Sequence, residues 1–432
     1  MSKPGTDLYD DLVFRGLIHQ MSDPGLAPRL GQEPMSVYIG FDPSADSLQV
    51  GSLLQICNLR RMQDAGHRPL ALAGGATGMI GDPGGKSEER NLLDADVLAA
   101  NLEGIRAQLG RYLDFSPAAG PRRAVLLDNG EWLKSMGLIE FLRDVGKHFT
   151  VNQMIAKESV HTRLTTREQG ISFTEFSYML LQSYDFLHLY DTHDCLLQMG
   201  GSDQWGNITM GIDLIRRLRS GQAWGLTTPL VLKADGTKFG KSEAGTVWLD
   251  PARTSPYQLL QFFVRTEDAM VGSYLRYFTW LDRDRLAELD EAVAAHPESR
   301  EAQWELARSV VSFVHGADQA ARAEAAARVL FSEEISGLDE DLLVEVFSDV
   351  PSSDLDRAEL DGPGLLIVDI LARSGLVASK SAARTALAQG GVYVNNTRQT
   401  DPALSLDRSH LLHDRYIILR RGKREQHLLR FA

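Results

Sequence analysis

Two lysines near the middle of the chain are spaced to act on a phosphate. Lys238 and Lys241 flank Phe239-Gly240 and precede Ser242, within the glycine-containing segment 231–249. Glycines favour a mobile loop over a regular element, and such a loop can bring cations to the negative charge that builds on a phosphate leaving group. A solvated surface turn would carry the same K-x-x-K-S letters. The polar residues elsewhere in the chain must therefore decide between the two interpretations.

A second group of polar residues follows helical spacing. Tyr178, Gln182 and Asp185 stand at i, i+4 and i+7 in the segment 174–187, which predicts one stripe on one helix face. Apolar residues flank the stripe, so part of it is expected to be buried. Buried polar groups need partners, which a bound polar ligand could supply. A stripe that faces solvent would show the same spacing.

A strand followed by a turn and a helix predicts a site for an anion near the N-terminus. Residues 35–40 are expected to form a buried strand, and residues 48–65 a helix with Ser47 as its N-cap. Gly51 in the first helical turn suggests that another part of the molecule approaches that backbone closely. Backbone N–H groups at such a helix start attract phosphates. A purely structural turn would look similar.

A glycine-rich segment follows the second expected strand, residues 69–74. The segment 75–90 contains one carboxylate, Asp82, and two cations, Lys86 and Arg90. It is too rich in glycine for a regular element. We therefore expect a second loop with charged groups at the carboxyl end of a strand.

Two further strands also end at polar residues. Asn129 follows the expected strand 124–128, and a Gly-Gly turn follows the strand that begins at Leu196. The second strand and its turn contribute Gln198, Asp203 and Gln204, which could reach a sugar or an amino acid. Strands that alternate with helices predict a parallel sheet covered on both faces, with ligands at the carboxyl ends of its strands.

The remainder of the chain divides by composition. Residues 332–360 contain ten acids and one arginine, which favours a flexible connector, although residues 342–347 could form a short helix. We predict five parts: a catalytic domain at 1–230, a mobile loop at 231–250, a helical domain at 251–331, an acidic linker at 332–360 and a small C-terminal domain at 361–432.

Length, charge and cysteine content limit the possible functions. The chain has 432 residues, which predicts several domains, and only two cysteines, which excludes a disulfide framework and an all-cysteine zinc site. No apolar run reaches membrane-spanning length and no signal peptide is visible, so we expect a cytoplasmic protein. The net charge is −13, yet residues 361–432 hold 11 basic and 6 acidic residues. A basic module on an acidic body suggests a nucleic-acid partner for that module.

An ordered set of motifs resembles the bacterial tyrosyl-tRNA synthetases, which are class I aminoacyl-tRNA synthetases. The motifs are Y-I-G-F-D-P-S-A-D-S-L at 38–48, G-G-A-T-G-M-I-G-D-P at 74–83, I-S-F-T-E-F-S-Y at 171–178, G-G-S-D-Q-W-G-N at 200–207, K-F-G-K-S at 238–242, S-K-S-A-A-R at 379–384 and G-G-V-Y-V-N at 390–395. The resemblance extends over nearly the whole chain. It implies an α/β fold: a Rossmann-like catalytic domain with a parallel sheet, an α-helical domain and a small α+β RNA-binding domain.

The resemblance also implies a role for individual residues. The expected tyrosine-binding residues are Tyr38, Asp82, Asn129, Tyr178, Gln182, Asp185, Gln198 and Gln204, with the substrate phenol held by Tyr38 and Asp185. The expected ATP-binding residues are Gly40, Asp42, Ser44, Gln49, Gly51, Ser52, Gly201, Asp203 and Lys241. The expected catalytic residues, which hold pyrophosphate, are Lys86, Arg90, Lys238, Lys241 and Ser242. For tRNA we expect Lys380, Arg384, Arg420, Arg421 and Lys423.

The implied partners are L-tyrosine, ATP with Mg²⁺ as a substrate complex, tRNA(Tyr) and a second copy of the chain. No resident metal, prosthetic group or membrane is implied. Tyrosine's ionised carboxylate can attack the α-phosphate without a strong general base, so positioning and charge stabilisation should carry the catalysis. This agrees with the chemistry suggested by the two lysines.

Three positions depart from the family pattern. The class I signature H-I-G-H reads Gln49-Val50-Gly51-Ser52 here, and Ile39 replaces a residue that is often polar or a thiol. Glutamine can donate a hydrogen bond to a phosphate oxygen but cannot become cationic. These departures leave two alternatives beside a tyrosine–tRNA ligase: a non-catalytic paralogue that binds tRNA or tyrosine, and an ATP-dependent ligase that delivers tyrosine to another acceptor.

Overall fold

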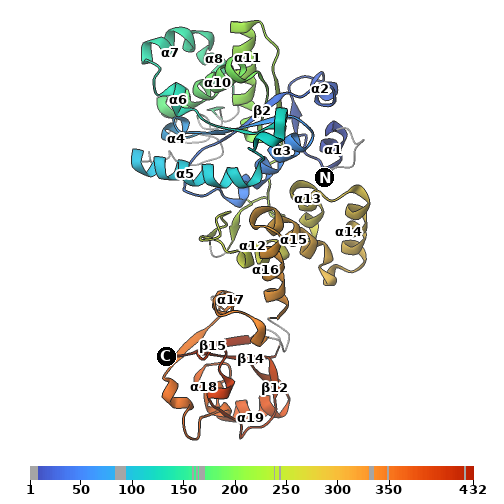
Figure 1. Cartoon of the computed structure of the whole chain (residues 1–432), viewed down its shortest axis with the longest axis vertical. Helices are drawn as coiled ribbons and strands as arrows, with labels where there is room; N and C mark the ends of the chain where they lie inside the picture. The colour runs from blue at the N-terminus through green and yellow to red at the C-terminus, as the bar shows by residue number, and fades with distance from the viewer. Residues whose placement is uncertain are drawn as a thin grey trace. The chain divides into compact units, whose positions relative to one another are not determined.

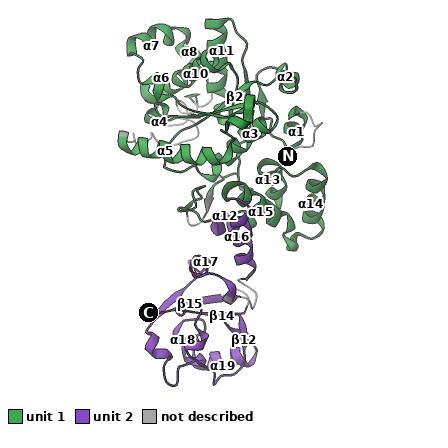
Figure 2. Ribbon diagram, in the orientation of Figure 1, with its two compact units in different colours: residues 1–255, 262–315 green, residues 256–261, 316–432 purple. Residues whose placement is uncertain are grey.

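The chain folds into two compact units, which are described separately. The computed structural model describes residues 8–82, 94–157, 160, 161, 164, 171–237, 239–242, 245–329, 335–347, 350–422 and 425–432. Unit 1 comprises residues 1–255 and 262–315, and unit 2 comprises residues 256–261 and 316–432 (Figure 2).

Unit 1 is built on a six-stranded sheet with the order β1-β6-β5-β2-β3-β4. The strands are β1 (Gln20–Met21), β2 (Ser36–Phe41), β3 (Arg68–Ala73), β4 (Val125–Asp128), β5 (Cys195–Gly201) and β6 (Trp224–Thr228). The five strands β2 to β6 are parallel, and the short β1 pairs antiparallel with β6 at one edge. The predicted parallel α/β sheet is thus confirmed.

The strand order fixes where a ligand can bind. From β2 the chain proceeds outward through β3 and β4, whereas β5 starts on the other side of β2 and is followed outward by β6. The order therefore reverses between β2 and β5, and a crevice opens beyond the carboxyl ends of strands at such a point. Both strands are almost wholly buried, as expected for a parallel sheet covered on both faces.

Helices cover both faces of this sheet (Figure 1). The helices α10 (Phe173–His193) and α11 (Trp205–Arg219) lie above it as drawn, and α5 (Ala95–Tyr112) lies below. The N-cap Ser172 accepts a hydrogen bond from the Glu175 N–H, and this cap starts α10 in a fixed orientation toward the sheet. The predicted helix over 174–187 is confirmed and extends further at its C-terminal end.

The predicted N-cap at Ser47 is wrong. The helix α3 spans Leu53–Asp64 and is preceded by a short 3₁₀ turn, η1 (Val50–Ser52), while Ser47 Oγ donates to the carbonyl of Leu48. Gln49 is extended and pairs with Trp248 in an isolated antiparallel bridge. This pairing keeps the chain extended where the apolar spacing alone predicted helix.

Residues 251–331 are mainly helical, as expected. They form α12 (Pro256–Val264), α13 (Asp268–Phe278), α14 (Arg283–Ala295), α15 (Glu301–His315) and α16 (Ala317–Val329). The division differs from the expected one because α13, α14 and α15 belong to unit 1, whereas α16 belongs to unit 2.

Two buried arginines attach α13 to the rest of unit 1. Arg61 Nη2 donates to the carbonyls of Arg276, Tyr277 and Thr279 at 3.2, 3.0 and 2.8 Å. Arg15 donates to the carbonyls of Arg276, Thr279 and Leu281. Cations are favourable at a helix C-terminus, where carbonyl groups lack intrahelical partners. Both side chains thus stabilise the helical segment against the sheet domain.

We expect Arg61→Ala to lower the free energy of unfolding by about 3 kcal/mol, because it removes a buried side chain together with its three hydrogen bonds to the end of α13. Urea denaturation monitored by far-UV circular dichroism would measure this. The matched control is Arg60→Ala on the same helix, since Arg60 forms a partly exposed ion pair with Asp64. That control should cost less than about 1 kcal/mol. Equal effects of the two substitutions would contradict the assignment.

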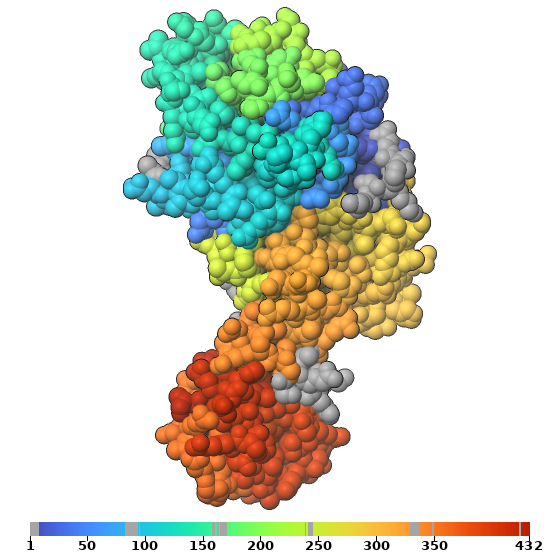
Figure 3. Space-filling view, in the orientation of Figure 1, coloured from blue at the N-terminus to red at the C-terminus, as the bar shows by residue number. Residues whose placement is uncertain are grey.

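Unit 2 contains a five-stranded sheet with the order β12-β11-β14-β15-β9. Its strands are β9 (Ser352–Leu355), β11 (Val392–Val394), β12 (Thr397–Gln399), β14 (Tyr416–Arg421) and β15 (Glu425–Phe431), and its helices include α17 (Glu340–Val346), α18 (Ile367–Arg373) and α19 (Lys380–Ala388). The small α+β domain expected at the C-terminus is present. The C-terminal residues, drawn orange to red in Figure 3, form a closely packed body.

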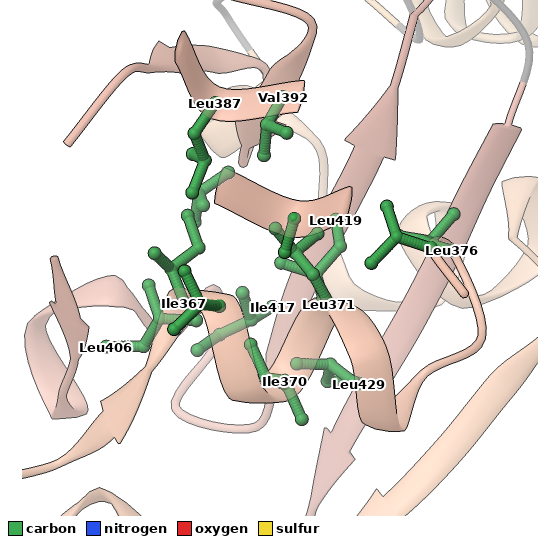
Figure 4. Packing of buried hydrophobic residues seen from close by; sticks show 14 of the residues in the cluster. Ile367, Ile370, Leu371, Leu376, Leu387, Val392, Leu406, Ile417, Leu419 and Leu429 are labelled. Atoms are coloured by element: carbon green, nitrogen blue, oxygen red, sulfur yellow. The ribbon is translucent and has the colours of Figure 1, made fainter. Parts of the chain in front are cut away.

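The flexible acidic linker predicted for 332–360 is wrong for its described residues. β9 pairs in parallel with β15, and α17 contacts the same unit through Tyr416 Oη, which donates to Glu340. Several of its acids are exposed, so a solvated edge strand resembled a linker in composition; they are Asp339, Asp341, Asp354 and Asp356. Residues of α18, α19 and the strands share one apolar core, including Ile367, Leu371 and Leu419 (Figure 4). The C-terminal domain thus begins well before residue 361.

Candidate active site

A cavity of about 340 Å³ opens in unit 1 at the point where the strand order reverses. Its wall is made by the ends of β2 and β5, the start of α3, and one face of α10. The predicted residues on this wall are Tyr38, Gly40, Asp42, Gly51, Ser52, Asp82, Asn129, Tyr178, Gln182, Asp185, Gln198, Gly201, Asp203 and Gln204. The structure therefore brings most of the expected tyrosine and ATP groups together.

One end of the cavity is equipped to hold a hydroxyl group. The hydroxyl of Tyr38 is buried, and no residue that the structure describes forms a hydrogen bond with it. Asp185 is buried nearby, and its two carboxylate oxygens accept from Asn129 Nδ2 at 2.9 Å and Trp132 Nε1 at 2.8 Å. A carboxylate can accept further bonds beyond these two. A donor and an acceptor are thus both available at this end.

The pKa values at this end follow from burial. Burial, followed by the nearby charge of Asp185, raises the pKa of Tyr38 well above its ordinary value, so the phenol stays protonated and able to donate. Burial raises the pKa of Asp185 to about 7, against the opposing effect of the bonds from Asn129 and Trp132. Such a shift at a cavity wall is a common mark of a functional carboxylate.

The middle of the cavity is lined by carboxylates and amides. Tyr178 Oη donates to Asp42 at 3.1 Å, and Gln204 Nε2 donates to Asp82 at 2.5 Å. Gln182 Nε2 donates to Gln204 Oε1 at 3.2 Å. Asp42 and Asp82 both contribute to raising the pKa of Tyr178, after its burial. Acidic groups gathered in a partly buried site favour a cationic ligand such as an ammonium group.

The other end of the cavity meets the start of α3. Gly51 and Ser52 line it just before the first turn of that helix, and Ser52 makes no side-chain cap bond. Helix N-termini present N–H groups and positive potential to anions. The close approach expected at Gly51 is not found, because a Cβ at Gly51 would lie 3.8 Å from the carbonyl oxygen of Phe239, an ordinary van der Waals distance.

Sequence reasoning missed several residues of the cavity region, among them Gln55 and Trp132. Gln55 lines the cavity, its Nε2 donates to Thr228 Oγ1 at 3.0 Å, and its buried Oε1 has no partner among the described residues. Thr228 Oγ1 uses its own proton in a hydrogen bond to the carbonyl of Gly200, so it can only accept from Gln55. The Nε2 of Gln55 therefore faces Thr228, and its carbonyl oxygen Oε1 stays available as an acceptor. Helical spacing from Gly51 at i+4 could have indicated Gln55. Trp132, the partner of Asp185, carries no comparable signal in the sequence.

Some predicted residues lie elsewhere. Ser44 and Gln49 are exposed and do not line the cavity. Lys241 and Ser242 form a two-residue strand, β7 (Lys241–Ser242), paired with β8 (Gly245–Thr246), so the expectation of no regular element in this loop is wrong there. Lys86, Arg90, Lys238 and Lys423 lie outside the described residues.

The predicted tRNA residues of unit 2 are not equivalent. Lys380, Arg384 and Arg421 are exposed. Arg420 is buried, lies 3.7 Å from the ring centroid of Tyr393 and donates to Asn396. A guanidinium held in this way stabilises the hairpin of β11 and β12, so the expected phosphate contact is unsupported for Arg420.

Within the described residues, no cluster of three or more His, Cys, Asp or Glu side chains could hold a metal ion. Likewise, none of their helices is long and apolar enough to cross a membrane.

Comparison with known proteins places both units in one family. Residues 30–332 match the family of class I tRNA synthetases for tryptophan and tyrosine, and residues 343–429 match the C-terminal domain of tyrosine–tRNA ligases. The chain is 52% identical to the tyrosine–tRNA ligase of Roseiflexus castenholzii, covering 99% of this chain and all of that one. It is 48% identical to tyrosine–tRNA ligase 1 of Bacillus subtilis, with the same coverage.

A solved structure shows the same fold. A C-terminally truncated mitochondrial tyrosyl-tRNA synthetase of Aspergillus nidulans superimposes with a TM-score of 0.66 at 32% identity, covering 76% of this chain and 94% of that one. The alternative of a non-catalytic paralogue gains no support from any of these relatives. With nearly full-length identity near one half, and with a cavity that collects the expected side chains, the chain belongs to the tyrosine–tRNA ligases, a family of class I aminoacyl-tRNA synthetases.

Proposed function

We propose that the cavity of unit 1 performs both steps of the tyrosine–tRNA ligase reaction. In the first step a carboxylate oxygen of tyrosine bonds to the α-phosphorus of ATP, the bond from that phosphorus to the bridging oxygen breaks, and pyrophosphate leaves. In the second step a ribose hydroxyl at the 3′ end of tRNA(Tyr) attacks the tyrosyl carbonyl, and AMP leaves. Neither step needs a resident cofactor, and Mg²⁺ enters with ATP as part of the substrate.

One observation carries this proposal. Within the part of the chain that the structure describes, three buried polar atoms on the wall of this cavity have no hydrogen-bond partner, namely Tyr38 Oη, Gln198 Oε1 and Gln55 Oε1. A buried polar group without a partner costs about 1–3 kcal/mol, so its presence favours a ligand that completes the bond. Tyr38 and Gln198 stand on neighbouring strands, whereas Gln55 lies on α3. The three polar atoms without a partner are thus distributed from the expected tyrosine end of the cavity to its expected nucleotide end.

The proposed roles follow the chemistry of each region. Tyr38 donates to the substrate phenol and Asp185 accepts from it, while the carboxylate of Asp82 and its neighbours receive the ammonium group. The start of α3, with Gly51 and Ser52, receives phosphates. Gln55 presents a hydrogen-bond acceptor to the nucleotide.

Gln49, which replaces the first histidine of the class I signature, is exposed. The backbone of Gln49 is fixed by the bridge to Trp248, and its side chain does not line the cavity. We therefore propose that Gln49 takes no essential part in the first step and that the lysines of the adjacent loop carry the charge stabilisation. Under this proposal Gln49→Ala leaves activation within a few-fold of the parent chain.

Tyrosine-dependent exchange between ATP and pyrophosphate tests the proposed function. We expect exchange with tyrosine, weak exchange with phenylalanine, and charging of bulk tRNA with tyrosine. Absence of exchange at high protein concentration would overturn the catalytic proposal. Exchange without charging of tRNA would instead favour a ligase that uses another acceptor.

We infer that the protein works in the cytoplasm, where tRNA is charged. Both cysteines, Cys57 and Cys195, are buried and unpaired, which fits a reducing compartment.

We also propose that two copies of the chain associate through the surface of α7 (Leu138–Asp144) and α8 (Val151–Ile155). Leu138 and Ile139 are 69% and 75% exposed, and Val151 is 58% exposed. A soluble protein seldom exposes a group of large apolar side chains without a partner. The resemblance to dimeric enzymes selects a second copy as that partner.

We expect the double substitution of Leu138→Glu and Ile139→Glu to convert the dimer into a monomer in sedimentation-velocity runs at micromolar concentration. Charges placed in a dry interface cost several kcal/mol, which is enough to dissociate it. Val97→Glu on α5 is the control, since Val97 is also an exposed apolar residue but lies outside α7 and α8. A dimer that survives the double substitution would place the interface elsewhere.

A further inference from the structure

Phe239 lies between the two lysines of the loop, yet its ring is buried. It is 9% exposed, although it belongs to a glycine-containing surface segment. Its ring centroid lies 5.0 Å from Tyr274, 5.3 Å from Phe262 and 5.7 Å from Phe278. Aromatic pairs at such distances contribute about 0.5–1.5 kcal/mol each beyond their buried area. The ring thus fixes one point of the loop on the helical segment of unit 1.

The backbone beside this ring lies against the nucleotide end of the cavity. Gly240 has φ = +97°, and a Cβ there would lie 3.1 Å from Val50 Cγ1 and 3.4 Å from the Gly51 nitrogen. Only glycine combines that backbone conformation with so close an approach. The anchored ring therefore sets how closely the loop approaches Gly51, a residue of the cavity wall.

Backbone hydrogen bonds extend this contact on both sides. The Val247 N–H donates to Gly240 O, the Val50 N–H donates to Val247 O, and the Leu249 N–H donates to Leu48 O. On the other limb of the loop, Tyr274 Oη donates to the carbonyl of Leu232 at 2.7 Å. The loop is thus attached to the cavity wall through its backbone and to α13 through Tyr274 and Phe239.

We propose that Phe239 is a positioning residue for the activation step. Its ring, held by the aromatic cluster, anchors the loop backbone between the sequence positions of the two lysines, and through this anchor it supports their stabilisation of the departing pyrophosphate. Phe239 makes no contact with substrate in this account and acts only through the two lysines. The inference rests on the proposed role of these lysines in the function above.

The test is a mutant cycle measured by single-turnover formation of tyrosyl-adenylate. We expect Phe239→Ala to slow this step by about 10- to 100-fold while the Kd for tyrosine changes less than two-fold, because the lost interaction belongs to the transition state. In a chain that already carries Lys238→Ala and Lys241→Ala, the same substitution should slow the step by less than two-fold. Phe239→Leu, which keeps an apolar anchor, should restore most of the rate.

Phe313→Ala is the control for loss of an aromatic side chain. Phe313 stacks with Tyr112 at 5.5 Å and packs on Trp280 in the same unit, and none of the ring contacts of Phe239 among the described residues involves it. The Phe313→Ala substitution should lower thermal stability without slowing activation.

If Phe239→Ala slows the step equally with and without the lysines, Phe239 is only structural. The same holds if Phe239→Ala weakens tyrosine binding by as large a factor as it slows the step. If the lysine substitutions themselves leave the rate unchanged, the proposed role of the lysines fails instead. If Phe239→Ala does not fold, Phe239→Val, which keeps fewer of the ring contacts than leucine would, takes its place in the same cycle and is expected to show the same dependence on the lysines.

Discussion

Asp185→Asn is expected to lower kcat/KM for tyrosine activation by about 30- to 5,000-fold. Removing one member of a buried, charged hydrogen-bond pair costs about 2–5 kcal/mol, and Asp185 is a buried carboxylate on the cavity wall whose charge acts on Tyr38. An amide at this position would also direct a donor toward Asn129 or Trp132, which already donate. Tyrosine-dependent pyrophosphate exchange measures the loss.

Tyr38→Phe provides the matched comparison at the same end of the cavity. Its hydroxyl has no hydrogen-bond partner among the described residues, so removing it leaves none of their groups unsatisfied. We expect a loss of about ten-fold for tyrosine and none for phenylalanine. A site that reserves hydrogen bonds for a substrate hydroxyl rejects the analogue without it by about 10⁴–10⁵-fold, a range established with an enzyme of this family. Both substitutions should therefore reduce the preference for tyrosine.

The raised pKa of Asp185 adds a pH dependence with a defined sign. Because this pKa is about 7 in the folded protein, the carboxyl becomes protonated as the pH falls below 7, and KM for tyrosine should rise. For folding, a carboxyl whose pKa is raised contributes stability below its unfolded value near 4, and this contribution is lost as the pH rises toward 7. The melting temperature of Asp185→Asn relative to the parent chain should hence be higher at pH 8 than at pH 5.

Tyrosine activation and the melting temperature, both measured as a function of pH, separate a loss of function from misfolding. An inactive but well-folded Asp185→Asn chain, whose relative stability increases with pH, is the expected result. Unchanged activation by tyrosine would show that Asp185 does not hold the phenol. A KM for tyrosine that varies with pH equally in the parent and in Asp185→Asn would remove Asp185 as the titrating group.

The sequence allowed much of this cavity to be predicted, because two physical rules are visible in it. Helical spacing placed Tyr178, Gln182 and Asp185 on one face, and that face does line the cavity. Strand ends of a parallel sheet converge, so Asn129 and Gln198 were expected near it. Local patterns of this kind depend only on the period of an element and on the direction of its strands.

Features that depend on distant contacts could not be predicted. Ser47 was expected to cap α3, but the bridge between Gln49 and Trp248 holds that segment extended. The segment 352–355 was expected in a linker, because an edge strand with one solvated face is polar in composition. Arg420 resembled a phosphate contact, yet it packs on Tyr393. In each case a partner remote in sequence overrode the local signal.

A chain that ends at residue 334 is expected to lose more than 99% of tRNA charging while keeping tyrosine activation within about two-fold of the parent. The truncation removes the basic C-terminal module, with Lys380 and Arg384 exposed on it, and phosphate contacts supply much of the affinity for nucleic acids. The cavity lies wholly in unit 1. Charging of bulk tRNA and pyrophosphate exchange, measured on the same preparation, would check both halves of this expectation.

The residue at which the chain is truncated decides whether the remaining part folds, so a truncation at a different residue serves as the control. A chain that ends at residue 360 keeps β9 but loses its partner β15, and it keeps Glu340 but loses Tyr416. We expect this longer chain to expose apolar surface and to aggregate more than the shorter one. The truncated Aspergillus nidulans synthetase, which matches 76% of this chain, supports the folding of the remaining part. Full charging by the shorter chain would show that tRNA binds without the C-terminal module.

The most direct test of the account is a crystal structure of the protein with a stable analogue of tyrosyl-adenylate. We expect the phenolic oxygen of the analogue to lie within hydrogen-bonding distance of both Tyr38 Oη and an Asp185 carboxylate oxygen, with the phosphate near Gly51. A phenolic oxygen that meets neither side chain, or an analogue bound outside this cavity, would contradict it.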